Sequence, residues 1–253
     1  MKIYALLNWY DERPDWLAAT VASASKLCDG IIAVDGAYFL FPDSLRYPTS
    51  GASQATAIME TALSLDMSCT IHVPDGPWSG NEVGKLQALF DLGIPEPMED
   101  WFFRIDGDEL LTDVPFDAHE RIEKTGLHAV DLRMWVRTDG VTRHEMWPIR
   151  RLWRVMTDMR VGPAHHIMSA INDGERIILA DSENRARQTP GLDMPDLRME
   201  HRNRQRNPER LERKEQYYRQ RDELGVEKED AWPLPTSQQP TSGNGQSSLT
   251  ART

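Results

Sequence analysis

Cysteine is scarce in this chain, which has 253 residues and only two cysteines, Cys28 and Cys69. Both fall within predicted helices or strands and lack zinc-ligand spacing, so we expect buried core residues in a reducing compartment. No apolar stretch approaches the roughly 20 residues of a membrane-spanning helix. A signal peptide needs a longer apolar region than Ile3–Leu7, the run near the N-terminus. These absences predict a cytoplasmic protein without a transmembrane segment.

Basic residues are outnumbered in this sequence. Lysine and arginine total 29 against 40 aspartates and glutamates, which gives a formal net charge of −11. Because nucleic-acid backbones are bound by basic surfaces, we expect no general affinity for nucleic acid. Residues 233–253 are poor in apolar side chains and rich in Pro, Ser, Thr, Gln and Gly, which predicts a disordered tail. With 40% hydrophobic residues the chain can bury a core, and we predict a single domain over 1–232.

Short apolar runs alternate with helical patterns over residues 1–110. The runs, each typical of a buried strand, are 3–7, 31–34, 69–73 and 101–105. Between them, apolar residues recur at three-to-four spacing after Pro14, after Ala52 and after the capping-box sequence Ser79–Glu82. This alternation predicts an α/β fold of Rossmann type, with a mostly parallel central sheet and helices on both faces.

The pattern changes after residue 110. Residues 130–136 alternate apolar and polar side chains, Asp139-Gly140 marks a turn, and 152–155 could be the returning strand. A further apolar run covers 177–179. We therefore expect a mixed or antiparallel second half over 111–200, which would bind an acceptor, while 1–110 would bind a nucleotide.

Charged residues dominate the chain from Arg198 onward. Asn207-Pro208 suits the start of a helix. Glu209 with Arg213, and Glu215 with Arg219, are spaced to pair along an exposed helix face. The sequence therefore predicts a charged helical extension within 201–232.

Two acidic residues stand at the end of the fourth predicted strand. Asp106 and Asp108 flank Gly107, and two carboxylates at that position can hold a hard cation such as Mg²⁺ or Mn²⁺. The alternative is an ordinary acidic surface turn, which Asp-Gly commonly makes. The carboxyl ends of parallel strands meet at one edge of a sheet, where open α/β sheets bind ligands, and this favours the metal.

Other residues at the same edge have the chemistry of a nucleotide site. Glu12 and Asp35 can accept hydrogen bonds from a ribose or a base, and Lys85 near a helix start can attract a phosphate. Each also has a simpler explanation, because acids suit turns and helix starts and a helical lysine is commonly solvated. Together with a metal, however, they predict a nucleotide-diphosphate site.

These motifs resemble the family 2 type of glycosyltransferase with the GT-A fold. The matching stretches are Tyr10-Asp11-Glu12-Arg13, Ile31–Gly36, Phe103–Glu109, Arg150–Arg154 followed by Gly162 and His165-His166, and His201 followed by a basic helix with tyrosines. The resemblance covers roughly residues 1 to 225, and it departs from the family pattern at Ala37–Phe41, where a Ser/Thr-rich continuation is usual.

The resemblance implies transfer of a sugar from a nucleotide-diphosphate donor to an acceptor hydroxyl, with Mn²⁺ or Mg²⁺ as cofactor. The residues that it assigns to the nucleotide sugar, with Lys85 added from its position, are Tyr10, Glu12, Asp35, Gly36, Lys85 and Asp106. Those assigned to the metal are Asp106, Asp108 and His166, with His165 and His201 as alternatives. Asp108 would be the principal metal ligand, and Asp106 would lie nearer the donor.

The sequence does not identify the catalytic base or the two substrates. Glu145, Asp173 and Glu175 are the available carboxylates for proton removal, and Lys85 or Arg151 could stabilise the departing diphosphate. The donor sugar, the acceptor and the oligomeric state are not specified. The alternative functions are a nucleotidyltransferase and a non-catalytic domain that binds a nucleotide sugar or a protein partner.

Overall fold

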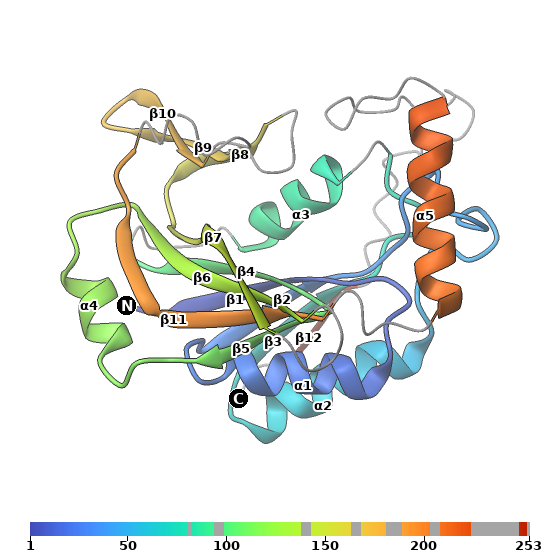
Figure 1. Cartoon of the computed structure of the whole chain (residues 1–253), viewed down its shortest axis with the longest axis horizontal. Helices are drawn as coiled ribbons and strands as arrows, with labels where there is room; N and C mark the ends of the chain where they lie inside the picture. Colours follow the sequence, from blue (N-terminus) through green and yellow to red (C-terminus); the bar gives the residue numbers. More distant parts are fainter. Residues whose placement is uncertain are drawn as a thin grey trace.

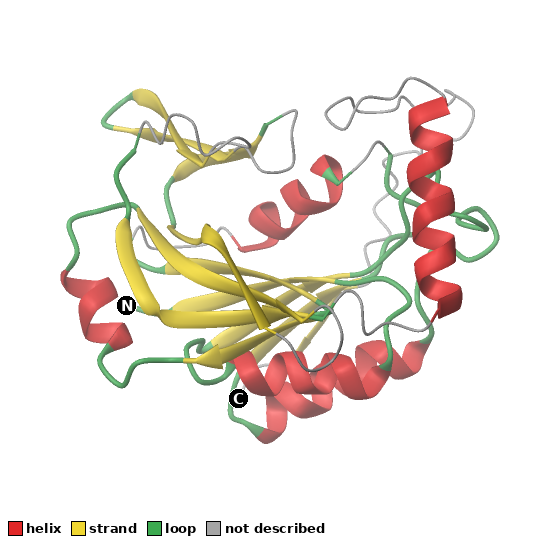
Figure 2. Cartoon of the chain, in the orientation of Figure 1, coloured by secondary structure: helices red, strands yellow, loops and turns green. Residues whose placement is uncertain are grey.

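The structure is a computed structural model that describes residues 1–79, 82–93, 99–137, 143–162, 168–180, 189–202, 208–223 and 248–251. Side chains are described for these residues except 137, 143–147 and 248–251. A nine-stranded sheet forms the middle layer, and helices lie against both of its faces (Figures 1 and 2). The fold is therefore of the α/β class, as the sequence predicts.

Four parallel strands form the first half of the large sheet. They are β1 (Ile3–Asn8), β2 (Gly30–Val34), β3 (Ser68–His72) and β4 (Trp101–Asp106), adjacent in the order β3-β2-β1-β4. The helices α1 (Pro14–Ala24), α2 (Ala52–Ser64) and α3 (Val83–Gly93) connect them in turn. Because the chain order reverses between β1 and β4, a crevice forms at the carboxyl ends of these two strands.

Successive residues of the central strands face opposite sides of the sheet. Leu7 packs in the layer that contains Leu17 of α1 and Ile58 of α2. Leu6 lies in the opposite layer with Phe90 of α3 and Phe102 of β4. Burial on both faces explains why these strands read as continuous apolar runs in the sequence. Both cysteines are buried and free, as predicted.

The second half of the chain extends the same sheet. Its strands are β5 (Glu109–Asp113), β6 (Ala129–Arg137), β7 (Arg143–Arg154) and β11 (Leu192–His201), in the order β4-β7-β6-β11-β5. Strand β7 is antiparallel to β4 and β6, whereas β11 runs parallel to β6. A short helix, α4 (Ala118–Lys124), joins β5 to β6. The expected mixed second half is confirmed.

Two further elements flank the sheet. Strands β8 (Thr157–Val161), β9 (Met168–Asn172) and β10 (Glu175–Ala180) form a small antiparallel sheet on the α3 side. The charged helix α5 (Pro208–Glu223) stands beside the carboxyl ends of the parallel strands (Figure 1). No helix in the described part of the chain combines the length and apolarity that crossing a bilayer requires.

Three details differ from the sequence predictions. The sheet is mixed rather than mostly parallel, because only β3, β2, β1 and β4 and the β6–β11 pair run parallel. Within the predicted disordered tail, β12 (Ser248–Ala251) pairs antiparallel with β3 and forms one edge of the large sheet. Helix α3 begins at Val83, so Ser79 does not stand immediately before its first residue. The predicted turn at Asp139-Gly140 lies outside the described residues.

Candidate functional site

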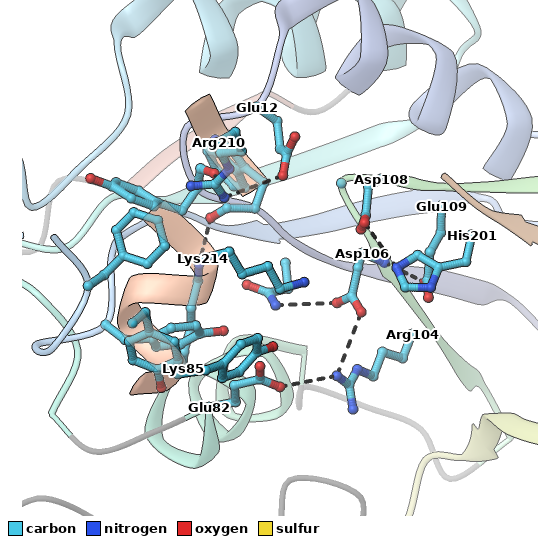
Figure 3. A pocket seen from close by; sticks show the side chains of 18 of the residues that line it. Glu12, Glu82, Lys85, Arg104, Asp106, Asp108, Glu109, His201, Arg210 and Lys214 are labelled. Carbon is cyan, nitrogen blue, oxygen red and sulfur yellow. Dashed lines mark hydrogen bonds and ion pairs between the residues drawn. The ribbon is translucent and has the colours of Figure 1, made fainter. Parts of the chain in front are cut away.

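A cavity of about 250 Å³ opens at the crevice between the ends of β1 and β4. Its walls come from the residues after β1, the turn between β4 and β5, the strands β7 and β11, and one side of α5. Five acidic side chains line this cavity together with six that carry or can carry positive charge (Figure 3). The acids are Glu12, Glu82, Asp106, Asp108 and Glu109, and the others are Lys85, Arg104, Arg151, His201, Arg210 and Lys214.

A tight turn places the predicted metal residues at the cavity. Asp106 ends β4, and its backbone N–H donates to Glu109 Oε2 at 2.8 Å across the turn. Gly107 donates its N–H to the carbonyl of Asn8 at 2.9 Å, and a Cβ there would come within 3.1 Å of Glu12 Cγ. Glycine therefore lets β1 and the turn lie this close, because any other residue would force the neighbouring side chains to shift.

Asp106 lies between two buried guanidinium groups. Its Oδ2 is 3.8 Å from Arg104 Nη2 and 3.7 Å from Arg151 Nη2, and its Oδ1 accepts a hydrogen bond from Asn8 Nδ2 at 3.3 Å. Burial alone would raise the pKa of Asp106, but Arg104 and Arg151 outweigh it and lower the pKa. Asp106 is therefore ionised at neutral pH.

Glu109 holds the turn against the second half of the sheet. It is 1% exposed, and its Oε1 accepts a hydrogen bond from Arg151 Nη2 at 2.8 Å while Oε2 accepts from Asp106. Burial raises the pKa of Glu109 to about 7, and the Arg151 guanidinium opposes this rise. Through Glu109, strand β7 fixes the position of the turn that carries Asp106.

Asp108 is paired with a histidine from the other half of the chain. His201, the last residue of β11, places Nε2 3.0 Å from Asp108 Oδ2. Burial would lower the pKa of His201, but the bond to Asp108 and the neighbouring acids outweigh it and raise the pKa above its ordinary value. His201 is the one of the three predicted histidines that the structure describes, and it lies at the carboxylates. His165 and His166 lie outside the described residues.

Helix α5 closes another side of the cavity. Arg210 Nη2 donates to the carbonyl of Tyr10 at 2.5 Å and lies 3.4 Å from Glu12 Oε1, and its guanidinium stacks over Tyr10 and Phe41. Tyr217 packs into the same aromatic cluster, in ring contact with Phe41. Both Tyr10 and Glu12 line the cavity, where the sequence predicts a nucleotide sugar.

Asp35 and Gly36 do not line this cavity. The Asp35 carboxylate accepts hydrogen bonds from the backbone N–H and the hydroxyl of Ser50, at 2.7 and 2.6 Å. Gly36 has φ +113°, and a Cβ there would lie 2.7 Å from the Trp78 indole nitrogen. These two residues stabilise the loop after β2. The sequence could not distinguish this structural role from nucleoside binding.

Lys85 borders the cavity but is bound to the backbone. It is 1% exposed, and its ammonium donates to the carbonyls of Trp9 and Gly36 at 2.5 and 2.8 Å. Burial lowers the pKa of Lys85 to about 7, although Asp35 opposes the shift. Lys85 thus joins the loops that follow β1 and β2, and its donors are directed at carbonyls rather than at a phosphate.

The donor chemistry of the Asp106–Asp108 turn suits Mn²⁺ or Mg²⁺. In the residues that the structure describes, no three His, Cys, Asp or Glu side chains are grouped closely enough to hold a metal ion as they stand. This is compatible with Mg²⁺, which is often bound by one or two carboxylates together with substrate phosphates. Asp106, Asp108 and His201 would supply the protein ligands, once the direct Asp108–His201 contact opens.

Two of the three predicted bases, Asp173 and Glu175, do not line this cavity. Asp173 and Glu175 are exposed at the turn between β9 and β10, and the side chain of Glu145 is not described. Conversely, sequence reasoning missed Arg104, Glu82 and Arg210 as cavity residues. Only Arg104 gives a sequence signal, because it is the one charged residue within an apolar run that predicts a buried strand.

Comparison with known proteins does not identify a family. No family model matches the sequence, and no curated protein matches it. Among solved structures, the crystal structure of mannose-6-phosphate isomerase from Helicobacter pylori aligns over 80% of this chain and 97% of its own, at 10% sequence identity and a TM-score of 0.35. A likeness of this size carries no argument about fold family or function.

Proposed function

We propose that this chain is a metal-dependent glycosyltransferase that moves a sugar from a nucleotide-diphosphate donor to an acceptor hydroxyl. One observation carries the proposal. The cavity at the β1–β4 crevice gathers two carboxylates and an imidazole at one turn, and the cations Arg210 and Lys214 reach it from α5. The order β3-β2-β1-β4, with its reversal beside the cavity, supports a Rossmann-like GT-A fold, and open α/β sheets bind nucleotides at such points.

The charges of the cavity suit a diphosphate that is accompanied by a metal. A bound divalent cation would act as a Lewis acid on the diphosphate oxygens, an effect worth several kcal/mol in the transition state. Asp106, Asp108 and His201 would hold that cation. Arg210 and Lys214 lie where they can stabilise negative charge on the leaving diphosphate without taking part in bond formation. Tyr10 and Glu12, beside Arg210, border the space available to the nucleoside.

A thermal-shift panel tests the proposal. Nucleoside diphosphates and nucleotide sugars are added to the wild-type protein, with and without Mn²⁺. A ligand at about 100 times its Kd stabilises the folded state by about 2.7 kcal/mol. For a chain of this size that raises the Tm by about 5 to 10 °C. We expect such a shift for at least one nucleotide, only with the metal.

Matched carboxylate-to-amide variants locate the effect. Asp108→Asn should abolish the metal-dependent shift, whereas Asp91→Asn, which changes an exposed carboxylate on α3, should leave it intact. Release of the nucleoside diphosphate from a nucleotide sugar then separates catalysis from binding. A panel in which no nucleotide raises the Tm, or in which Mn²⁺ makes no difference, would contradict the proposal.

A further inference from the structure

Helix α1 contacts the turn between β4 and β5 through one buried hydroxyl. Thr20 is fully buried, and its Oγ1 lies 2.9 Å from the carbonyl oxygen of Glu109 and 3.2 Å from that of Gly107. A hydroxyl carries a single proton, so the two carbonyls share it. Thr20 does not line the cavity, and it therefore holds the turn from behind.

Arg202, the residue after His201, binds the same turn. Its backbone N–H donates to the carbonyl of Asp108 at 2.8 Å, and its Nη2 donates to Thr20 Oγ1 at 3.2 Å. The guanidinium lies over Trp16 of α1, with Cζ 4.4 Å from the ring centroid. A hydroxyl that accepts from a guanidinium directs its own proton elsewhere, here toward the turn carbonyls. Thr20 and Arg202 together thus bind the carbonyls of all three residues of the turn, 107–109.

These bonds fix the direction of the Asp108 side chain. A residue has only two soft backbone dihedrals, so its Cα–Cβ direction is set once the peptide planes on both sides are held. The plane before Asp108 carries the Gly107 carbonyl, to which Thr20 donates. The plane after it carries the Asp108 carbonyl, to which Arg202 donates. Because Arg202 directly follows His201, the second bond also holds the backbones of Asp108 and His201 side by side.

We propose that Thr20 and Arg202 are positioning residues that set the metal affinity of Asp108 and His201 from behind the cavity. The inference rests on the proposed function above. Residues that orient metal ligands without touching the metal typically change metal affinity by about tenfold to a hundredfold when they are replaced. Bonds that served only to attach α1 to the sheet would contribute to stability and leave the metal affinity unchanged.

Helix α1 itself provides the matched control. Ser23 is also buried, and its hydroxyl accepts a hydrogen bond from the backbone N–H of Leu111 in β5 at 3.0 Å and donates to the carbonyl of Thr20 at 2.7 Å. It therefore attaches α1 to the same strand, but beyond the turn. Ser23→Ala should lower the urea midpoint of unfolding about as much as Thr20→Val does, without weakening the metal.

Titration with Mn²⁺ tests the inference. Electron paramagnetic resonance counts the free ion, for each protein alone and with UDP or GDP added. Thr20→Val keeps the branched shape of the side chain, removes the hydroxyl and should weaken Mn²⁺ binding by about tenfold to a hundredfold. Thr20→Ser restores the hydroxyl and should bind Mn²⁺ within about threefold of wild type, as should Ser23→Ala.

Arg202→Met tests the second half of the pair, also if Thr20→Val does not fold. A thioether can keep contact with the Trp16 ring, while the donor to the Thr20 hydroxyl is lost. We expect Mn²⁺ binding to weaken by about tenfold. The double variant with Thr20→Val should bind Mn²⁺ more tightly than the two single effects multiplied together imply, because both act through one hydroxyl.

The outcomes separate this inference from the proposed function. If the wild-type protein binds no Mn²⁺ in any of these conditions, the proposed function fails. If Asp108→Asn loses Mn²⁺ but Thr20→Val and Arg202→Met bind it within about threefold of wild type, the positioning role is overturned while the proposed function stands. A loss in Ser23→Ala as large as that in Thr20→Val overturns it as well, since the attachment of α1 would then be the cause.

Discussion

Glu109→Ala should be among the most destabilising single substitutions in this chain. The side chain is 1% exposed and accepts two hydrogen bonds of 2.8 Å, one from Arg151 and one from the backbone of Asp106. Its loss leaves the Arg151 guanidinium buried without a hydrogen-bonded carboxylate and leaves the Asp106 N–H without its partner. Asp106 is a poor substitute, because its Oδ2 is 3.7 Å from Arg151 and is shared with Arg104.

The magnitude follows from the burial of this pair. Removing one partner of a buried ion pair costs about 3–5 kcal/mol, because an uncompensated charge is left behind. That is a large part of the roughly 5–15 kcal/mol by which folded domains are stable. Urea unfolding at pH 8, where Glu109 is ionised, measures the change. Glu120→Ala breaks an exposed pair with Lys124 on α4 and should cost no more than about 0.5 kcal/mol.

A double variant separates charge from packing at the same position. The single variant Glu109→Leu leaves the buried charge of Arg151 unpaired. The double variant, Glu109→Leu with Arg151→Met, removes that charge as well. The double variant should therefore be more stable than the sum of the two single effects implies, by at least about 1 kcal/mol. If Glu109→Ala costs less than about 1 kcal/mol, or if the two single effects simply add, then Glu109 does not hold the turn through Arg151.

Three other substitutions test the structural residues around the cavity. For Lys85, whose pKa of about 7 lies below the 10.5 of an exposed lysine, the unfolded state holds a proton that the folded state lacks, so stability should rise with pH between these values. Lys85→Met should remove this rise. The difference in unfolding free energy between wild type and variant should then grow from pH 7 to 9, by up to about 1.4 kcal/mol per pH unit. A difference that stays constant with pH would contradict this. Gly36→Ala should cost more than about 2 kcal/mol in urea unfolding, because Gly36 has φ +113° and Trp78 beside it, whereas Gly76→Ala, with open space, should cost less than about 1. Asp35→Asn should lower the free energy of unfolding by about 1–2 kcal/mol but change nucleotide affinity less than threefold. If the loss of affinity is as large as that in Asp108→Asn, Asp35 contacts the nucleotide after all.

The parallel half of the fold could be predicted because its strands are buried on both faces. Continuous apolar runs and three-to-four helical spacing depend only on local sequence, and they place β1, β2, β3 and β4 within two residues of their observed bounds. Sheet order is different, because it depends on contacts between distant segments. The parallel β6–β11 pair joins residues about 60 apart in sequence, and no local pattern specifies such a partner.

The site was predictable where the chain itself places residues at strand ends. Asp106 and Asp108 meet the loop after β1 because parallel neighbours end at the same edge, which topology alone requires. His201 was only one of three candidates, since its approach to Asp108 depends on β11 lying between β6 and β5. Asp35 and Lys85 show the opposite case. Their positions at the edge were predicted, but the direction of each side chain depends on Ser50 and on two carbonyls that sequence spacing cannot locate.

Asp106 and Asp108 are two residues apart, and their surroundings assign them different parts in metal binding. A divalent cation near Asp106 Oδ2 would meet the guanidiniums of Arg104 and Arg151, which lie within 3.8 Å of that oxygen and would repel it. Asp108 is in contact with His201, and an imidazole that loses its proton becomes a ligand rather than a competitor. We therefore expect Asp108 and His201 to be the principal ligands of the cation. Asp106, whose Oδ2 is balanced by two arginines, would be the weaker third ligand and would lie nearer the donor.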